Sequence, residues 1–590
     1  MFLRCNVRKK NGKEHRYWSV VENRRVSTGK VVQRHVLYLG EINDSQQMAW
    51  RKSIQIFGDG AERPQTISLF PEDRIMPICD ETVVKIRLKD LALKKPRQWG
   101  ACWLACHLYE QLGLDRFWKE RLTPSRKGTR WDLIMQAMVC YRLIDPGSEW
   151  RLHREWFERS AMGDLLGGGY ELVEIHKLYE CLDLLLAHQK ELFDHLTRRW
   201  KDLFNASYEV LLYDLTSTYF ETDTLFSEED KRKYGYSRDK RSDCVQVVIA
   251  LVVTPEGFPL AYEVLRGNTR DSSTLAAFLK KIEDQHGKAK RIWVMDRGIP
   301  TEETLAMMRK SDYPMYYLVG TPKGRLSKLE KDLVNLPWKE VREGVQVKLL
   351  DQEKEMYVFA ESRDRINKER SMRRRQLKKL WKRLKELQAS VHHLKRDELM
   401  LKLGSVQQQS PSAWRLVQIE VIGGSAEKVV EKFHFALRKD RLRQVRQREG
   451  RYLLRTNLCD RDPAQLWSFY MVLVQVEESF KNLKGDLAIR PIFHQKMQRV
   501  EAHIFVAFVA YALHVTLRQH LKYSAPGLTP RAVLEKFRAI QMVDVHLPTT
   551  DGRTVILSRH TQPEPEHQVL LNQLHLTLPD QPPPPKIRST

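Results

Sequence analysis

Apolar runs with the length and composition of buried strands follow one another between residues 206 and 320. The segments YEVLLYDL, VQVVIALVV and FPLAYEVL come first, and SSTLAAFLKKIEDQ after them has the apolar spacing of a helix. A strand (RIWVMD), a helix (TEETLAMMRK) and a further strand (MYYLVG) complete the series. This order of elements predicts an α/β fold.

Three strands, helix, strand, helix, strand is the order of a ribonuclease-H-like mixed sheet, which we expect to be interrupted after residue 320. The interruption has strand-like pieces around one long charged helix, so we expect a β-rich insertion with a long basic helix. Residues 363 to 396 contain fourteen Lys and Arg against three acids. Apolar residues three and four positions apart form a heptad seam: Leu377, Leu380, Leu384, Leu387, Val391 and Leu394. The basic face is either a solvated face of a packed helical hairpin or a surface that follows DNA phosphates.

The charge of the chain favours a nucleic-acid partner. Lys and Arg outnumber Asp and Glu by 100 to 75, which gives a formal net charge of +25 and attracts polyanions. The longest fully apolar run, Ile504 to Leu513, is too short to span a bilayer, and no secretory signal is readable at the N-terminus. The cysteines form no CxxC pair, which fits a reducing compartment. We therefore expect a DNA-binding protein of the cytoplasm with no membrane segment.

Changes of apolar period and of proline content divide the chain into regions. Residues 1–62 form a basic β-hairpin region, with Gly29 in the turn and a net charge of +8 over residues 1–40, and this arm is a candidate DNA contact. We expect a linker over 63–98, an all-helical domain that could bind DNA ends over 99–205, the first part of the sheet domain over 206–320, the insertion over 321–460, the last part of the sheet domain over 461–522, and a C-terminal region with a Pro-rich tail over 523–590.

Three acids stand where a sheet of this kind presents side chains to one edge. Asp214 lies in the otherwise apolar strand LLYDLTSTYFE, where burying a charge is costly unless a metal or another partner compensates it. Asp296 ends the strand RIWVMD just before a loop, which is the usual ligand edge of an open α/β sheet. Glu477 lies in YMVLVQVEESFKNLK, and on one helix it would share a face with Tyr470, Leu473 and Lys484.

These residues carry a resemblance to a known family. The chain resembles DDE insertion-sequence transposases that have a large β-rich insertion before the Glu and a Y-x2-R-x3-E-x6-K signature on the last helix. The matching segments are YDLTSTYFE around Asp214, GYSRDKRSDCVQ, GNTRD, VMDRG around Asp296, and Tyr470-x6-Glu477-x6-Lys484 followed by RPIFH. One position departs from the pattern, because Leu473 stands where the signature has Arg.

The resemblance implies a catalytic triad of Asp214, Asp296 and Glu477 that holds two Mg²⁺ ions, for which Mn²⁺ could substitute. Asp214 would bridge both ions, and the other two acids would hold one each. Hard divalent cations prefer carboxylate oxygens, and two of them can stabilise the attacking and leaving oxygens at a DNA phosphodiester. Tyr470, Lys481, Lys484 and Arg297 are the expected DNA-binding residues. His494 and His503, in contrast, are more typical of packed or capping histidines than of ligands.

The implied reaction is cleavage at the ends of an insertion sequence and transfer of the freed 3′-OH to target DNA. The implied partners are the terminal inverted repeats and the target duplex, bound by a homodimer in a synaptic complex, with the protein associated with a prokaryotic nucleoid. No phosphate-binding loop is present, so ATP is not expected. Two alternatives stay open: a ribonuclease-H-fold DNA nuclease without strand transfer, and a non-catalytic DNA-binding protein derived from a transposase.

Overall fold

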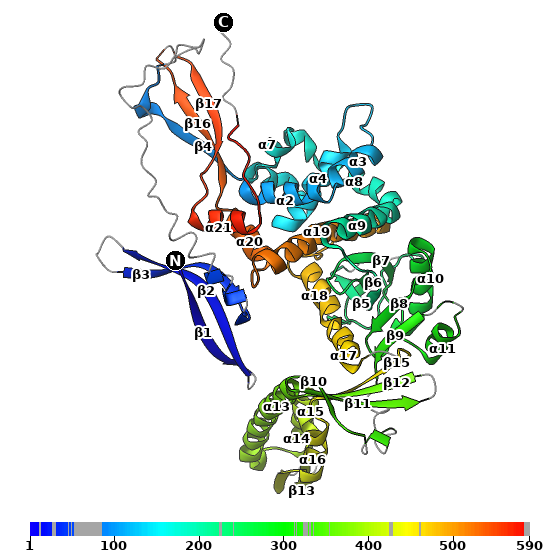
Figure 1. The fold of residues 1–590 in the computed structure, drawn as a ribbon. Helices are drawn as coiled ribbons and strands as arrows, with labels where there is room; N and C mark the ends of the chain where they lie inside the picture. Colours follow the sequence, from blue (N-terminus) through cyan, green and yellow to red (C-terminus); the bar gives the residue numbers. More distant parts are fainter. Residues whose placement is uncertain are drawn as a thin grey trace. The chain divides into compact units, whose positions relative to one another are not determined.

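The computed structural model shown in Figure 1 divides the chain into two compact units. It describes residues 1–10, 13–25, 31–44, 46–48, 50–51, 85–222, 227–239, 241–311, 313, 315–321, 329, 332–333, 336–352, 355–423, 429–459, 462–550 and 552–582. The first unit comprises Met1–Asn6, Arg16–Met315 and Val472–Thr590, and the second comprises Val7–His15 and Tyr316–Met471.

One sheet of the first unit has the strand order β8-β5-β6-β7. Its strands are β5 (Val210–Phe220), β6 (Val245–Val253), β7 (Pro259–Arg266) and β8 (Arg291–Met295). β5 pairs antiparallel with β6 and parallel with β8, and β6 pairs antiparallel with β7. Every residue of β6 is buried, which explains why its sequence is apolar from Val247 to Val253 rather than alternating. This order and these directions confirm the ribonuclease-H-like mixed sheet.

Helices flank this sheet in Figure 1. They are α10 (Leu275–His286), α11 (Glu302–Lys310) and α18 (Leu473–Lys484). α10 buries Leu275, Phe278, Leu279 and Ile282, which are the apolar positions that its helical spacing predicts. α18 contacts β5, so the segment with Glu477 returns to the strand that contains Asp214.

A group of helices surrounds α19 (Met497–Ser524). Its longer members are α2 (Gly100–Gln111), α3 (Leu114–Arg121), α4 (Trp131–Ile144), α8 (Ile175–Leu185) and α9 (Gln189–Phe204). Its shorter members are α5 (Glu149–Arg151), η2 (Leu152–Trp156), α6 (Phe157–Arg159), α7 (Met162–Leu166), η3 (Tyr170–Leu172) and η4 (Leu186–His188). α19 is long and apolar enough to cross a membrane, but 94% of its most apolar window is buried in the protein. It is therefore the core helix of this group.

Two smaller sheets have strands in the first unit, and the residues of the first sheet that lie within Val7–His15 are grouped with the second unit. The first has the order β1-β2-β3, with β1 (Phe2–Lys10), β2 (Lys13–Arg25) and β3 (Val31–Gly40), so three strands form where a hairpin was predicted. The predicted turn at Gly29 lies outside the described residues. The second has the order β17-β16-β4, with β4 (Ala92–Gln98), β16 (Gln541–Pro548) and β17 (Thr554–His560). β4 lies within the expected linker and pairs with β16. Arg97 of β4 donates a hydrogen bond to Asp544 of β16, which is 447 positions away in the sequence.

The remaining helical elements of the first unit are short. They are η1 (Leu88–Asp90), η5 (Asp271–Ser273), α20 (Pro530–Phe537) and α21 (Pro565–Gln573). Residues 63–84 of the expected linker 63–98 and residues 583–590 of the Pro-rich tail lie outside the described residues.

In the second unit, five strands follow one another in the order β10-β11-β12-β15-β9. They are β9 (Met315–Gly320), β10 (Lys339–Arg342), β11 (Val345–Gln352), β12 (Glu355–Ser362) and β15 (Arg451–Thr456). Strands β13 (Val417–Ile422) and β14 (Lys432–Leu437) form a separate pair. The helical elements are α13 (Arg363–Ser390), η6 (Val391–His393), α14 (Arg396–Gln409), α15 (Pro411–Trp414), α16 (Lys439–Arg448) and α17 (Pro463–Met471).

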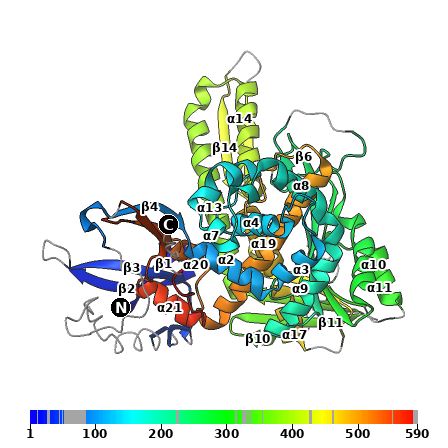
Figure 2. The same ribbon diagram turned by 90° about the horizontal axis from the view of Figure 1, so that it is seen from above.

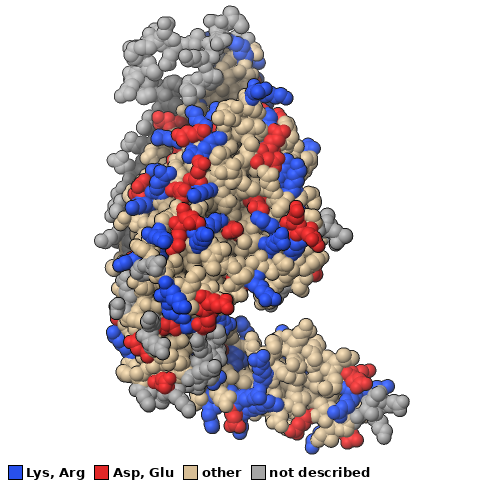
Figure 3. Space-filling view, turned by 90° about the vertical axis from the view of Figure 1, so that its right-hand side faces the viewer, with Lys and Arg blue, Asp and Glu red and all other residues tan. Residues whose placement is uncertain are grey.

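The long basic helix is α13, and Figure 2 shows β14 beside α13 and α14. The heptad seam packs inside this unit, because Leu380 and Leu384 belong to one buried cluster with residues of α14, α15 and β13–β14. The apolar residues of the heptad seam are therefore part of the hydrophobic core of the insertion itself. Figure 3 shows Lys and Arg interspersed with Asp and Glu on the face that it draws, rather than one basic patch.

Candidate active site

Two of the predicted acids lie at the same edge of neighbouring parallel strands. Tyr213 of β5 is in register with Met295 of β8, so Asp214 and Asp296 each follow a paired residue. The pKa of Asp214 is raised to about 7, mainly by burial and to a smaller extent by the carboxylates of Asp296 and Asp271. The backbone N–H of Leu215 and the Arg238 guanidinium lower this pKa in part. Asp214 is therefore a carboxylate that has lost water and faces other acids.

Such a carboxylate fits a divalent cation. A cation that binds Asp214 would replace the lost solvation and screen the repulsion from Asp296, and both groups offer the hard oxygen ligands that Mg²⁺ and Mn²⁺ prefer. The site therefore has the donor chemistry of a magnesium centre.

The third acid, Glu477, lies on α18. This helix turns Val476, Phe480 and Leu483 into the core, while Glu477 is on the exposed flank of that face. The neighbouring Glu478 lies 3.6 Å from Arg518 and has a counterion of its own. Among the described residues, Glu477 does not join Asp214 and Asp296 in a group whose ligand atoms all lie within 4.8 Å of one another. The structure thus brings the two aspartates together and puts Glu477 on a helix that contacts their strand.

The predicted single helix from Tyr470 to Lys484 is wrong. α17 ends at Met471 and α18 begins at Leu473, with Val472 in a turn between them. The Tyr470 ring stacks on Tyr452, with the ring centroids 5.4 Å apart. Tyr470 is therefore engaged in packing in the second unit, and it does not share a helix face with Glu477.

The predicted basic residues differ in their surroundings. Lys484 donates hydrogen bonds to both carboxylate oxygens of Asp239, at 3.1 and 3.0 Å, and burial lowers its pKa while Asp239 raises it. Lys481 and Arg297 are exposed, and Arg297 follows Asp296 in the loop after β8.

Sequence reasoning assigned no role to the acids and bases that lie around Lys484. Arg490 donates to the same Asp239 at 3.1 Å, and Arg238 donates to Asp271 at 2.7 Å. The backbone N–H of Arg238 also donates to Ser217 of β5, at 3.4 Å. The dense charges of SRDKRSD were the available signal, but only the folded chain shows which acid meets which base.

Comparison with known proteins gives the family. The model of the transposase DDE domain matches residues 205–513, which is more than half of the chain. The chain belongs to the DDE transposase family. The N-terminal domain of IS1634 family transposases matches residues 3–57 of this transposase. It is therefore an enzyme of DNA transposition and a product of an insertion sequence.

Two solved structures show a weak likeness to this transposase. A piggyBac transposase synaptic complex with hairpin DNA has 10% identity and a TM-score of 0.33, over 76% of this chain and 82% of that chain. A Mos1 transposase paired-end complex with the left transposon end has 10% identity and a TM-score of 0.14, over 31% of this chain and 57% of that chain. No curated protein matches the sequence.

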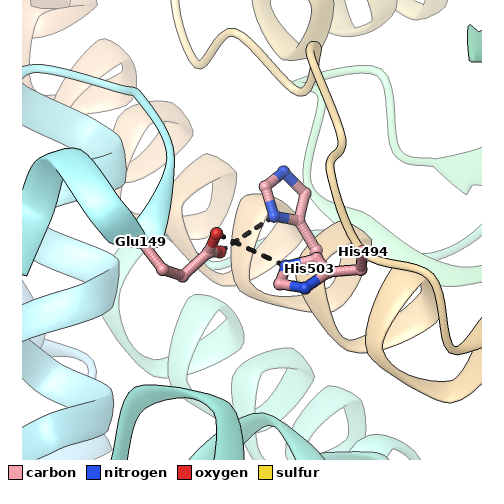
Figure 4. A group of neighbouring side chains, drawn as sticks. All are labelled: Glu149, His494 and His503. Atoms are coloured by element: carbon pink, nitrogen blue, oxygen red, sulfur yellow. Dashed lines mark hydrogen bonds and ion pairs between the residues drawn. The ribbon is translucent and has the colours of Figure 1, made fainter. Parts of the chain in front are cut away.

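The transposase has a second buried group of polar side chains, drawn in Figure 4. Glu149 lies 3.0 Å from His503 Nδ1 and 3.3 Å from His494 Nε2, and the ligand atoms of the three residues lie within 4.8 Å of one another. Arg142 lies 3.8 Å from Glu149, so the carboxylate already has a buried counterion. Burial and Arg142 lower the pKa of His503 to about 4, so His503 is neutral at pH 7. Because the positive charge of Arg142 balances the negative charge of Glu149, we interpret this group as a packed ionic network that joins α4 and α5 to α19.

Proposed function

We propose that Asp214, Asp296 and Glu477 hold divalent metal ions with which this transposase cleaves DNA at the ends of its element. The supporting observation is that Asp214 and Asp296 lie at the same edge of two neighbouring parallel strands. At that edge, burial and neighbouring acids raise the pKa of Asp214. A carboxylate in that position is expensive without a cation. Two Mg²⁺ ions, with Mn²⁺ as a substitute, would polarise the scissile phosphate and stabilise its attacking and leaving oxygens.

The chain's own residues have separate tasks in this proposal. Asp214, inside β5, would be a ligand to both metal ions, and its strand fixes its direction. Asp296, in the loop after β8, and Glu477, on the exposed flank of α18, each hold one position. Water and then the freed 3′-OH are the nucleophiles, so no covalent protein intermediate forms. Tyr470, Lys481, Lys484 and Arg297 are the proposed contacts to DNA phosphates.

The proposed partners are the terminal inverted repeats of the element and the target duplex. Joining two ends requires both to be held at once, and we propose a homodimer in a synaptic complex as the species that holds them. The protein would act at the nucleoid, in the cytoplasm of a prokaryotic cell, without ATP. The helical residues 99–205 and the β1-β2-β3 sheet are the proposed readers of the DNA ends.

The test is cleavage and joining of a labelled duplex that carries the inverted repeat flanking the coding region, with and without Mg²⁺. Asp214→Asn, Asp296→Asn and Glu477→Gln should retain DNA binding and lose cleavage. Glu478→Gln is the matched control, because Glu478 is the next residue on the same helix and is paired with Arg518.

Joined products would favour a transposition reaction over simple hydrolysis, and cleaved but unjoined DNA would favour the nuclease alternative. Activity without a divalent metal, or variants as active as the wild type, would contradict the proposed triad.

A further inference from the structure

Two basic side chains converge on one carboxylate close to Asp214. Lys484 Nζ lies 3.0 Å from Asp239 Oδ2, and Arg490 Nη1 lies 3.1 Å from the same oxygen. The exposed fractions of the Lys484, Asp239 and Arg490 side chains are 19%, 22% and 22%. Two cations so far removed from water need an anion between them. In this structure the Asp239 carboxylate is that anion.

The site is tied to the strand of Asp214. Arg238, next to Asp239, donates its backbone N–H to Ser217 of β5. The Arg238 charge lowers both the pKa of Asp214 and the pKa of Lys484, so it lies within electrostatic reach of both groups. An anion held by Lys484 would thus be a neighbour of the proposed metal site.

The chemistry of the pair suits a phosphate. Lysine supplies a point charge and arginine a planar fork of donors, and both recognise phosphate oxygens as well as carboxylates. The Arg490 guanidinium also lies over the ring of Tyr219 of β5, 4.5 Å from its centroid, which orients it. A nucleic-acid backbone would present such an oxyanion to the pair without any requirement for base sequence.

We propose that Lys484 and Arg490 together bind one phosphate of the DNA backbone, and that the Asp239 carboxylate occupies its place in the DNA-free protein. The inference rests on the proposed function and adds two residues to it: Arg490 as a phosphate ligand and Asp239 as a built-in competitor. Arg490 supplies a second cation to the site from the segment that follows α18, whereas Leu473 on that helix has no charge to offer.

The test compares binding of the full-length protein to the labelled inverted-repeat duplex over a range of salt concentrations, with Ca²⁺ in place of Mg²⁺ to prevent cleavage. Arg490→Ala should weaken binding by roughly three- to tenfold and lower the slope of log K against log salt by about one. Arg490→Lys should restore most of that slope. Asp239→Asn should tighten binding several-fold at low salt, because the DNA phosphate no longer competes with a carboxylate.

Arg499→Ala is the matched control. Arg499 has the same exposed fraction of 22%, pairs with Asp183 at 2.6 Å and lies over the ring of Tyr179, so its loss removes an equivalent ion pair elsewhere. Its salt slope should equal that of the wild type. The thermal midpoint of each variant shows whether it is folded.

A wild type that binds and cleaves the duplex, together with an Arg490→Ala variant of unchanged slope and affinity, would overturn the phosphate site alone. Weaker binding by Asp239→Asn would overturn the role of Asp239 as competitor. A wild type that neither binds nor cleaves the duplex would overturn the proposed function and this inference with it.

Discussion

Asp214 and Glu149 are both carboxylates that have lost most of their contact with water, and their surroundings differ. Glu149 has Arg142 beside it at 3.8 Å, and the imidazoles of His494 and His503 contact its carboxylate oxygens. Asp214 has Arg238 as well as the acids Asp296 and Asp271 within electrostatic reach, and burial still raises its pKa to about 7. A buried acid with its own counterion stabilises a fold, whereas one that faces further acids needs a ligand from outside. The comparison separates a structural cluster from a candidate catalytic one.

The largest expected effect tests the Asp214 side of this comparison. Asp214→Asn should lower the rate of DNA cleavage by about a thousandfold or more, because an amide cannot bridge two cations. The free energy of unfolding at pH 7.5 should not fall, since the substitution removes a carboxylate that is costly to bury. Cleavage assays and urea unfolding of the same preparation check both statements. A variant that loses activity only by losing its fold would give Asp214 a structural role.

Glu149→Gln should give the reverse pattern. The substitution leaves the Arg142 guanidinium buried without a counterion, and we expect the free energy of unfolding to fall by about 3–5 kcal/mol. Below the new melting temperature, the folded variant should cleave DNA at close to the wild-type rate. Glu158→Gln, an exposed acid on α6, is the control and should change neither quantity. Tight binding of Zn²⁺ to the wild type, lost in Glu149→Gln, would instead make the cluster a metal site.

The sequence predicted most of the fold, but it did not predict which charged side chains surround Asp214 and Glu149. The strand order and the place of Asp214 and Asp296 followed from apolar runs, because a strand buried on both faces is mostly apolar, as β6 is from Val247 to Val253. The break at Val472 could not be predicted, since no Pro or Gly marks it and both flanking segments keep helical spacing.

Pairings between distant residues were also beyond the sequence. Glu149 and His503 are 354 positions apart, and Asp239 and Arg490 are 251 apart. Neither distance in the chain carries a periodic signal, so the partner of each charge became visible only in the folded protein.

The pH dependence of stability sharpens the comparison further. The pKa of Asp214 is raised from its model-peptide value to about 7 in the folded protein, so the folded state holds a proton that the unfolded state has lost between about pH 4 and 7. This group therefore makes the metal-free protein less stable as pH rises through that range, by at most about 4 kcal/mol, with no further change above it. Urea unfolding at pH 5 and pH 8 should show a smaller loss for Asp214→Asn than for the wild type. An equal loss in both proteins would mean that Asp214 is ionised at low pH in the fold.

The smallest expected effect is the response to metal. Millimolar Mg²⁺ binds the folded but not the unfolded chain if the acids form a site, and a concentration ten times the dissociation constant adds about 1.4 kcal/mol, a few degrees in the melting temperature. The shift should disappear in Asp214→Asn and persist in Glu149→Gln, since Arg142 already balances the second cluster. Because Mg²⁺ also screens the many basic side chains, Asp214→Asn in the same buffer measures the general ionic effect, and only the difference between the two proteins belongs to the site. If Mg²⁺ fails to raise the melting temperature of Glu149→Gln alone, the metal binds at Glu149, His494 and His503. Glu149 would then be the metal ligand and Asp214 the structural carboxylate.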